Sequence, residues 1–166
     1  MAHTKETLDS ALERVFRENS RQLFISALAV TGCAEGAEDA VQEAFYGLFR
    51  MKRSPRHLKA YVFRAVRNAA LDQLEQKPRD GIEDSEPIFD SGGGPPDAAE
   101  KNEFRIKVIR AMKTLSDDER ETVVGHLYAD LTFRQIAKVR EISINTVWSW
   151  YRRGMGKLRK ELGDEL

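Results

Sequence analysis

Apolar residues recur along most of the chain at intervals of three and four positions, the spacing that places side chains on one face of an α-helix. No stretch alternates apolar and polar residues as a half-buried strand does, and no segment is repeated. The sequence therefore predicts an all-α protein. The predicted helices cover residues 8–28, 37–51, 60–75, 99–113, 116–128, 133–139 and 143–162.

Two helix starts carry the sequence signal of a capping box. Ser116 is followed three residues later by Glu119, and Thr132 is followed in the same way by Gln135. In this motif the hydroxyl accepts a hydrogen bond from the backbone amide of the later residue, whose side chain accepts one from the amide of the cap. Both positions are therefore predicted to begin a helix.

The last two predicted helices have the order and lengths of a helix-turn-helix. A short helix from Phe133 is followed by a turn over residues 140–142, and Ser143 is a suitable N-cap for the long helix after it. In this arrangement the second helix can enter a DNA major groove. We therefore expect a nucleic-acid surface near the C-terminal end of the chain.

The long C-terminal helix separates into an apolar stripe and a polar face. Trp148 lies beside the stripe and is expected to pack, whereas Trp150 is nearer the flank and is expected to be partly exposed. Gly154 and Gly156 each cost about 1 kcal/mol relative to alanine, so they are expected to loosen the second half of the helix. The residues of the predicted buried stripe are Ile144, Val147, Tyr151, Met155 and Leu158.

The formal net charge of the 166-residue chain is zero, but its charges are segregated. Residues 50–79 contain nine basic and two acidic residues, and residues 132–160 contain eight basic residues and one acidic residue. Residues 80–100 contain seven acidic residues and no basic one. Two basic segments separated by an acidic one predict two contacts with one polyanion, for which nucleic acid is the natural candidate.

A stretch rich in proline, glycine, serine and acidic residues separates the two basic segments. It covers residues 77–98 and has no helical or strand periodicity, as expected of a flexible linker. The predicted organisation is a three-helix domain at residues 1–76, the linker at residues 77–98 and a helix-turn-helix domain at residues 99–166.

Candidate catalytic and metal-binding groups are few. Glu38, Asp39 and Glu43 cluster on the exposed side of the second predicted helix, but no histidine, serine or metal-ligand cluster accompanies them. The three histidines have no partners at ligand spacing. We therefore predict a non-enzymatic protein without a metal or a cofactor.

The N-terminal ten residues contain no apolar run, so we expect neither a signal peptide nor a membrane span. Cys33 is the only cysteine in the sequence, which excludes an intramolecular disulfide. A single cysteine, expected to be a small buried residue, fits a cytoplasmic protein in a reducing compartment.

The third predicted helix has an aromatic ring, a cation and an amide on one exposed stripe. Tyr61, Arg64, Asn68 and Asp72 share this side of the helix, next to a basic loop at residues 52–59. Unpaired bases are bound by stacking on a ring, by charge at the phosphate and by polar groups at the base edge. The alternative is that Tyr61 covers the edge of the core and Asn68 is an ordinary surface amide.

Two parts of the chain resemble a known family of transcription factors. Residues 37–50, AEDAVQEAFYGLFR, and residues 60–72, AYVFRAVRNAALD, resemble region two of the extracytoplasmic-function (ECF) sigma factors. Residues 115–162 resemble region four of the same family. The order of the two regions, with a short acidic segment between them, makes the resemblance specific. It implies a bacterial sigma factor that binds core RNA polymerase, directs it to promoters and assists promoter opening.

The resemblance also implies three sets of contact residues. Those that lie where the family docks on the clamp helices of the largest polymerase subunit are Glu38, Asp39, Gln42 and Glu43. Those that lie where the family reads the minus-ten element are Lys52, Arg53, Arg56, Tyr61, Arg64, Arg67, Asn68 and Asp72. Those that lie where it reads the minus-thirty-five element are Arg134, Ser143, Asn145, Thr146, Ser149, Trp150, Arg152, Arg153 and Lys157.

The partners implied by the resemblance are promoter DNA, core polymerase with its clamp helices and the flap of its second subunit, and an anti-sigma factor. No small-molecule substrate and no direct membrane insertion are expected. If the two promoter elements are separated by roughly two turns of duplex at about 34 Å per turn, the two domains must sit on the order of 60 to 70 Å apart. A linker of about 22 residues reaches roughly 75 Å when extended but only about 27 Å as a relaxed coil, so the polymerase must hold it extended.

One residue of the helix-turn-helix departs from the family pattern at a position where backbone conformation matters. Glu141 stands in the turn, where the family usually has glycine. Either the turn avoids a positive φ angle, or it carries some strain.

Two other functions are open from the residues alone. A helix-turn-helix regulator that works without polymerase would bind duplex DNA tightly as an isolated protein. A sigma-like protein that mainly titrates polymerase or an anti-sigma factor would lack base discrimination by the face of the last helix that carries Ser149.

Overall fold

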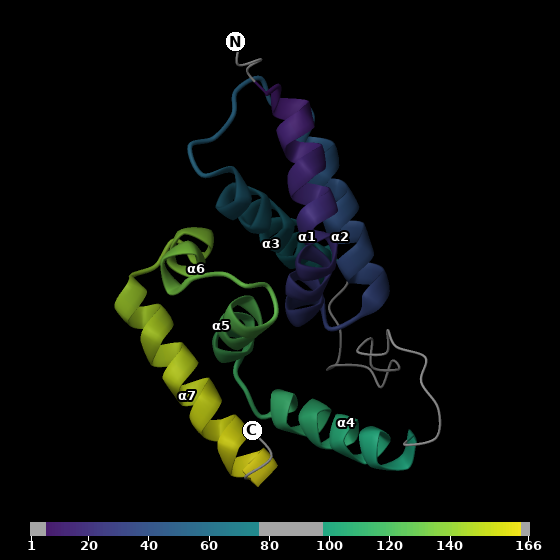
Figure 1. Cartoon of the computed structure of the whole chain (residues 1–166), viewed down its shortest axis with the longest axis vertical. Coiled ribbons are helices and arrows are strands. Elements are labelled where there is room, and N and C mark those ends of the chain that lie inside the picture. The colour runs from purple at the N-terminus through teal and green to yellow at the C-terminus, as the bar shows by residue number, and fades with distance from the viewer. Residues whose placement is uncertain (1–5, 77–97, 164–166) are drawn as a thin grey trace, which may run out of the picture.

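The structure of the chain, a computed structural model, describes residues 6–76 and 98–163 (Figure 1). The described residues form α-helices joined by turns and loops and contain no strand, which confirms the predicted all-α fold. The helices are α1 (Leu8–Thr31), α2 (Ala34–Leu48), α3 (Leu58–Gln76), α4 (Ala98–Lys113), α5 (Asp117–Leu127), α6 (Phe133–Arg140) and α7 (Ile144–Leu162).

Helices α1, α2 and α3 pack against one another as a three-helix bundle. The largest side chains at its centre come from α1 and α3, and α2 adds a row of smaller residues that lets the helices approach closely. Burial of this apolar surface is the main stabilising term of the bundle. The fully buried large residues of α1 and α3 are Leu12, Leu23, Val62, Phe63 and Val66.

The turn between α1 and α2 is held by its own side chains. Gly32 closes α1 in the left-handed region with φ of 73°, and its amide donates to the Leu28 carbonyl. Cys33 is buried as expected, and its Sγ accepts from the Gly36 amide at 3.2 Å, so the thiol serves as the N-cap of α2. This cap starts α2 three residues earlier than the apolar spacing predicts.

A second core lies between α4, α5 and α7, and its buried residues are Ala111, Leu115, Val123, Leu158 and Leu162. Both predicted capping boxes are present: Ser116 Oγ accepts from the Glu119 amide at 3.3 Å, and Thr132 Oγ1 accepts from the Gln135 amide at 3.2 Å. Helices α6 and α7 form the predicted helix-turn-helix.

Gly154 is required by the packing of α7 on α5, which corrects the expectation that it loosens the helix. The residue is buried, and a Cβ atom placed there would lie 2.9 Å from Cγ2 of Val123 and 3.4 Å from Cβ of Glu119. Glycine therefore sets the distance between the two helices. Gly156 faces open space, so of the two glycines only Gly156 is expected to lower helix stability relative to alanine.

The two helical groups are in direct contact in this structure. Helix α1 lies against α5, and α3 lies against α6, as Figure 1 shows. Leu131, Ile136 and Val139 belong to the same buried cluster as the core of the N-terminal bundle. The predicted linker at residues 77–98 lies outside the described residues except for Ala98, which begins α4.

We expect Gly154→Ala to lower the free energy of unfolding by about 1 to 3 kcal/mol, because the added methyl group must displace the stiff side chain of Val123. Urea denaturation followed by tryptophan fluorescence measures this, since Trp148 and Trp150 are the only tryptophans and both lie on α7. Gly156→Ala is the matched control and should leave stability unchanged or raise it by up to about 1 kcal/mol. Equal effects of the two substitutions would contradict the packing role of Gly154.

Candidate nucleic-acid interface

The exposed stripe predicted on α3 is present, with one qualification. Tyr61 is 39% exposed, and Asn68 and Asp72 are exposed on the same side of the helix. Arg64 is half-buried, because its Nη2 lies 2.7 Å from Oε1 of Glu141 in the turn between α6 and α7. The aromatic ring and the amide are therefore available to a ligand, while the cation between them already has a partner.

The basic loop before α3 presents its cations to solvent. Lys52, Arg53 and Arg56 are exposed, and Pro55 lies between them in a segment without regular structure. Lys59, at the start of α3, places its ammonium group over the Phe63 ring, 5.9 Å from the centroid. The loop can therefore attract a phosphate backbone that passes along α3 toward Tyr61.

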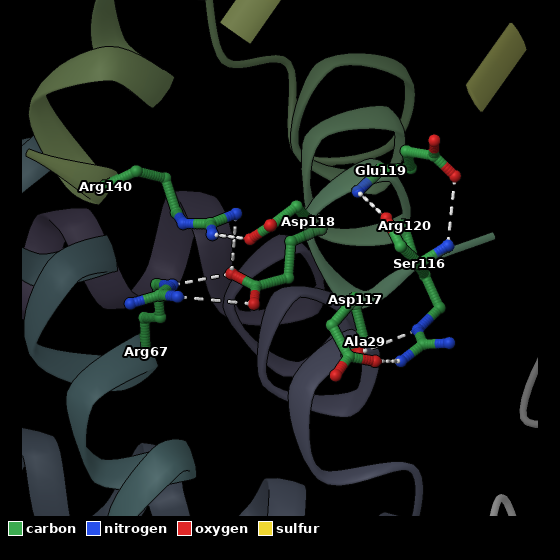
Figure 2. A network of polar contacts seen from close by, with 9 residues as sticks. Ala29, Arg67, Ser116, Asp117, Asp118, Glu119, Arg120 and Arg140 are labelled. Atoms are coloured by element: carbon green, nitrogen blue, oxygen red, sulfur yellow. Dashed lines mark hydrogen bonds and ion pairs between the residues drawn. The ribbon is translucent and has the colours of Figure 1, made fainter. Parts of the chain in front are cut away.

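Arg67, predicted together with the other minus-ten residues, is half-buried and has an acidic partner. Its Nε is 2.6 Å from Oε2 of Glu121 on α5, and its Nη2 is 3.3 Å from Oε1 of the same carboxylate. Arg140 approaches from α6 and pairs with Asp118 and, at 3.3 Å, with Oε2 of Glu121. Figure 2 shows Arg67 and Arg140 converging on this point between the two helical groups.

Helix α7 presents a polar face at its N-terminal half. Ser143 caps the helix by accepting from the Thr146 amide at 3.1 Å, so its hydroxyl is used in the fold as predicted for a cap. Thr146 is half-buried beside it. The exposed side chains on α7 that were predicted to read the minus-thirty-five element are Asn145, Ser149, Arg152, Arg153 and Lys157, and Arg134 of α6 is exposed as well.

The predicted exposure is correct for Trp150 but wrong for Trp148. Trp150 is partly exposed as expected and stacks under the guanidinium of Arg140, whose Cζ lies 4.9 Å from the ring centroid. Trp148 is 52% exposed and Ile144 is 48% exposed, although both were expected to pack. The reason is that Val147, fully buried, takes the core position of this turn, so that Trp148 lies at the edge against Phe133 and Tyr151.

The C-terminal half of α7 contacts the first turn of α5 through the buried carboxylate of Glu119. Burial of Glu119 raises its pKa, but hydrogen bonds from the Lys157 ammonium and the Ser116 amide, with the charge of Arg153 nearby, outweigh burial and hold the pKa below its ordinary value. Lys157 Nζ lies 2.6 Å from Oε2 of Glu119, and Arg153 Nε lies 3.9 Å from Oε1. Lys157 thus has a structural partner, whereas Arg153 projects more freely.

The predicted polymerase-docking residues share an exposed acidic face on α2. Glu38, Asp39, Gln42 and Glu43 are all exposed, and Gln73 of α3 donates to Oε2 of Glu43 at 3.3 Å. Beyond them on the same helix, Tyr46 is 70% exposed, and Cζ of Arg50 lies 5.6 Å from the centroid of its ring. Helix α2 lies on the side of the bundle away from α5 and α6 (Figure 1).

The part of the chain that the structure describes contains no group of histidine, cysteine, aspartate and glutamate side chains able to hold a metal ion. His126 packs against Phe133 and Tyr151, and its Nδ1 is 2.9 Å from the Leu131 carbonyl oxygen, as expected of a structural histidine. Within the same described residues, no helix is both long and apolar enough to cross a membrane.

Sequence reasoning missed the ionic cluster between α3, α5 and α6. The resemblance placed Arg67 with the minus-ten residues, and Asp118 and Glu121 were assigned no role. One available signal was Glu141, an acidic residue in a turn that favours glycine. A second was the spacing of Asp118 and Glu121, which puts two carboxylates on one side of α5.

Comparison with protein families matches two separate parts of this chain. Residues 15–79 match the model of Sigma-70 region 2, and residues 105–158 match that of Sigma-70, region 4. The ECF RNA polymerase sigma factor SigM of Mycobacterium tuberculosis, from two strains, is 28% identical over 159 residues, which cover 92% of this chain and 78% of SigM.

Among solved structures, a similar fold is that of the sigma factor RpoE of Bartonella quintana, crystallised in complex with the anti-sigma factor NepR. The TM-score is 0.68 at 20% sequence identity, and the match covers 94% of this chain and 99% of that one. The fold is therefore shared over nearly the whole length of both chains.

The lowered pKa of Glu119 predicts how acid destabilises the helix-turn-helix. Because the folded-state pKa lies below that of the unfolded chain, the stabilisation is complete above the ordinary glutamate pKa of about 4.3 and is lost as the pH falls through the folded-state value. We expect Glu119→Gln to lower the free energy of unfolding near neutral pH and to flatten its decline on acidification. Urea unfolding followed by tryptophan fluorescence at a series of pH values measures this. Glu161→Gln, an exposed residue of the same domain, should leave the slope unchanged, and an unchanged slope for Glu119→Gln would contradict the assignment.

Proposed function

This chain belongs to the sigma-70 family and is an RNA polymerase sigma factor of the ECF type, and from this premise we propose how its surfaces divide promoter recognition. The observation that carries the proposal is the pair of matches, region 2 at residues 15–79 and region 4 at residues 105–158, in the order of the family. The chain directs core polymerase to specific promoters and assists their opening. It is a transcription initiation factor, and nucleotide addition is left to the polymerase.

The proposed minus-ten surface is the outer side of α3 with the loop before it. Tyr61 offers a ring on which a displaced base can stack, and Asn68, two turns along the helix, offers an amide to a base edge. The exposed cations Lys52, Arg53 and Arg56 hold the phosphate backbone. Because a base must leave the duplex to reach the ring, binding energy on this surface favours strand opening.

The proposed minus-thirty-five surface is the N-terminal half of α7. Asn145, Ser149 and Arg152 lie at intervals of four and three residues, so they follow one line along the helix toward the major groove. Asparagine and serine make base-edge contacts, and arginine either reads guanine or binds phosphate. Arg134 at the start of α6 and Arg153 on α7 extend this surface to the flanking backbone.

The proposed docking surface for core polymerase is the acidic face of α2. Its residues are exposed, and Glu43 accepts a hydrogen bond from Gln73 of α3. In the family this face meets the clamp helices of the largest subunit, and region four meets the flap of the second. We also propose regulation by an anti-sigma factor and a cytoplasmic location, as is usual for the family.

We expect Asn68→Ala and Tyr61→Ala to slow open-complex formation by holoenzyme about tenfold or more, since a base stacked on an aromatic side chain contributes about 1 to 3 kcal/mol. Permanganate reactivity of unpaired thymines measures opening, and gel shift at low temperature measures closed-complex binding, on a promoter from which the holoenzyme initiates. Tyr61→Phe keeps the ring and should open normally, as should Gln76→Ala at the far end of α3. Equal losses in closed and open complexes would remove the strand-capture role from this surface.

A further inference from the structure

Two large apolar side chains in the first two turns of α7 are exposed to solvent. Trp148 is 52% exposed and Ile144 is 48% exposed. Their spacing of four residues places them on one line along the helix. Val147, which is fully buried, already fills the core at this level. Ile144 and Trp148 therefore form an apolar strip whose exposure is not explained by packing within the chain.

The apolar strip borders the residues that are proposed to read the minus-thirty-five element. Asn145, Trp148, Ser149 and Arg152 have the spacing i, i+3, i+4 and i+7, so they share one side of the helix, and all four are exposed. In a helix-turn-helix, the N-terminal residues of the second helix are the ones that contact base edges. The strip is thus continuous with the proposed DNA surface.

An aromatic cluster supports the Trp148 ring from one side. The ring centroid of Trp148 lies 5.7 Å from that of Phe133 and 6.4 Å from that of Tyr151. His126 packs on the same two rings, with centroid distances of 4.5 Å to Phe133 and 5.1 Å to Tyr151. A side chain that is already packed on one side loses less conformational entropy when a ligand covers the other side. The indole is therefore a preorganised apolar contact.

The charge around the strip indicates the kind of partner that covers it. Residues 143–160 contain five basic residues and no acidic one, and Arg134 at the start of α6 is exposed as well. An apolar strip among cations fits a polyanion that carries apolar groups. In duplex DNA the apolar group of the major groove is the 5-methyl group of thymine, which apolar side chains of reading helices contact.

We propose that Ile144 and Trp148 form an apolar subsite for the 5-methyl groups of thymines in the minus-thirty-five element. This inference rests on the proposed function, because it takes α7 as the helix that reads this element. The two residues are about 6 Å apart along the helix and base pairs are about 3.4 Å apart, so they contact different thymines. The strip distinguishes thymine from cytosine, while the polar residues beside it read hydrogen-bonding groups.

Replacement of thymine by deoxyuridine tests the subsite, because it removes the 5-methyl group and keeps the base pair. Holoenzyme assembled from core polymerase and this chain is bound to a fluorescein-labelled promoter duplex from which it initiates. Deoxyuridine is placed at one thymine of the minus-thirty-five element at a time, and anisotropy gives the Kd. We expect the wild-type holoenzyme to bind about fourfold more weakly at each of two positions, the loss that corresponds to one buried methyl group.

Substitutions in the strip should abolish this sensitivity one position at a time. Trp148→Ala should bind the thymine and deoxyuridine duplexes equally at one of the two positions, and Ile144→Ala should do so at the other. Ile106→Ala is the matched control, since it truncates an exposed isoleucine on α4 of the same domain, and it should keep the wild-type ratio at both positions. Thermal melting checks the fold of each variant, and Ile144→Ala alone provides the test should Trp148→Ala fold poorly.

A wild-type holoenzyme that binds equally well with deoxyuridine at every position would overturn the subsite. So would a wild-type ratio that persists in both strip variants, and a simultaneous loss of core binding would then assign the strip to a polymerase contact. Either result leaves the proposed function intact if Asn145→Ala and Arg152→Ala weaken promoter binding. If those two variants bind as the wild type does and no thymine is sensitive, α7 does not read the element, and the function proposed for this surface fails as well.

Discussion

The carboxylate of Glu121 joins the two halves of the structure within their shared apolar contact. It accepts from Arg67 of the N-terminal bundle and lies beside Arg140 of the helix-turn-helix, and Asp118 balances the second cation. Because Arg140 and Glu121 are largely buried, removal of either one would leave an uncompensated charge away from water. The stacking of Arg140 on Trp150 connects this cluster to α7.

The consequence is an asymmetry between the two proposed DNA surfaces. The N-terminal half of α7 projects polar and basic side chains into solvent with its backbone fixed by the Ser143 cap and the contact of Lys157 with Glu119. The outer side of α3 exposes the Tyr61 ring and the Asn68 amide. Arg64 and Arg67 on the same helix are paired with carboxylates. The polar face of α7 is thus open to solvent, whereas Arg64 and Arg67 of α3 have acidic partners.

Much of the fold followed from local rules in the sequence. The capping boxes at Ser116 and Thr132, the cap at Ser143 and the buried position of Val147 depend on residues close in sequence, so spacing was sufficient to predict them. The errors have a different origin. Trp148 is exposed because its neighbour Val147 occupies the core position of that turn. Glycine is needed at position 154 because α5 packs closely against α7 there. The ion pair of Arg67 was not predicted because its partner is a carboxylate on another domain.

Run-off transcription by purified core polymerase, with and without this protein, on fragments of the genome that encodes it, followed by mapping of the start sites, tests whether the chain is a sigma factor. That function predicts discrete new starts that share two upstream elements, one at the distance proposed for α3 and one at the distance proposed for α7. Core binding without any new start would contradict it and indicate a protein that sequesters polymerase, and the absence of core binding would indicate a DNA-binding regulator that works alone.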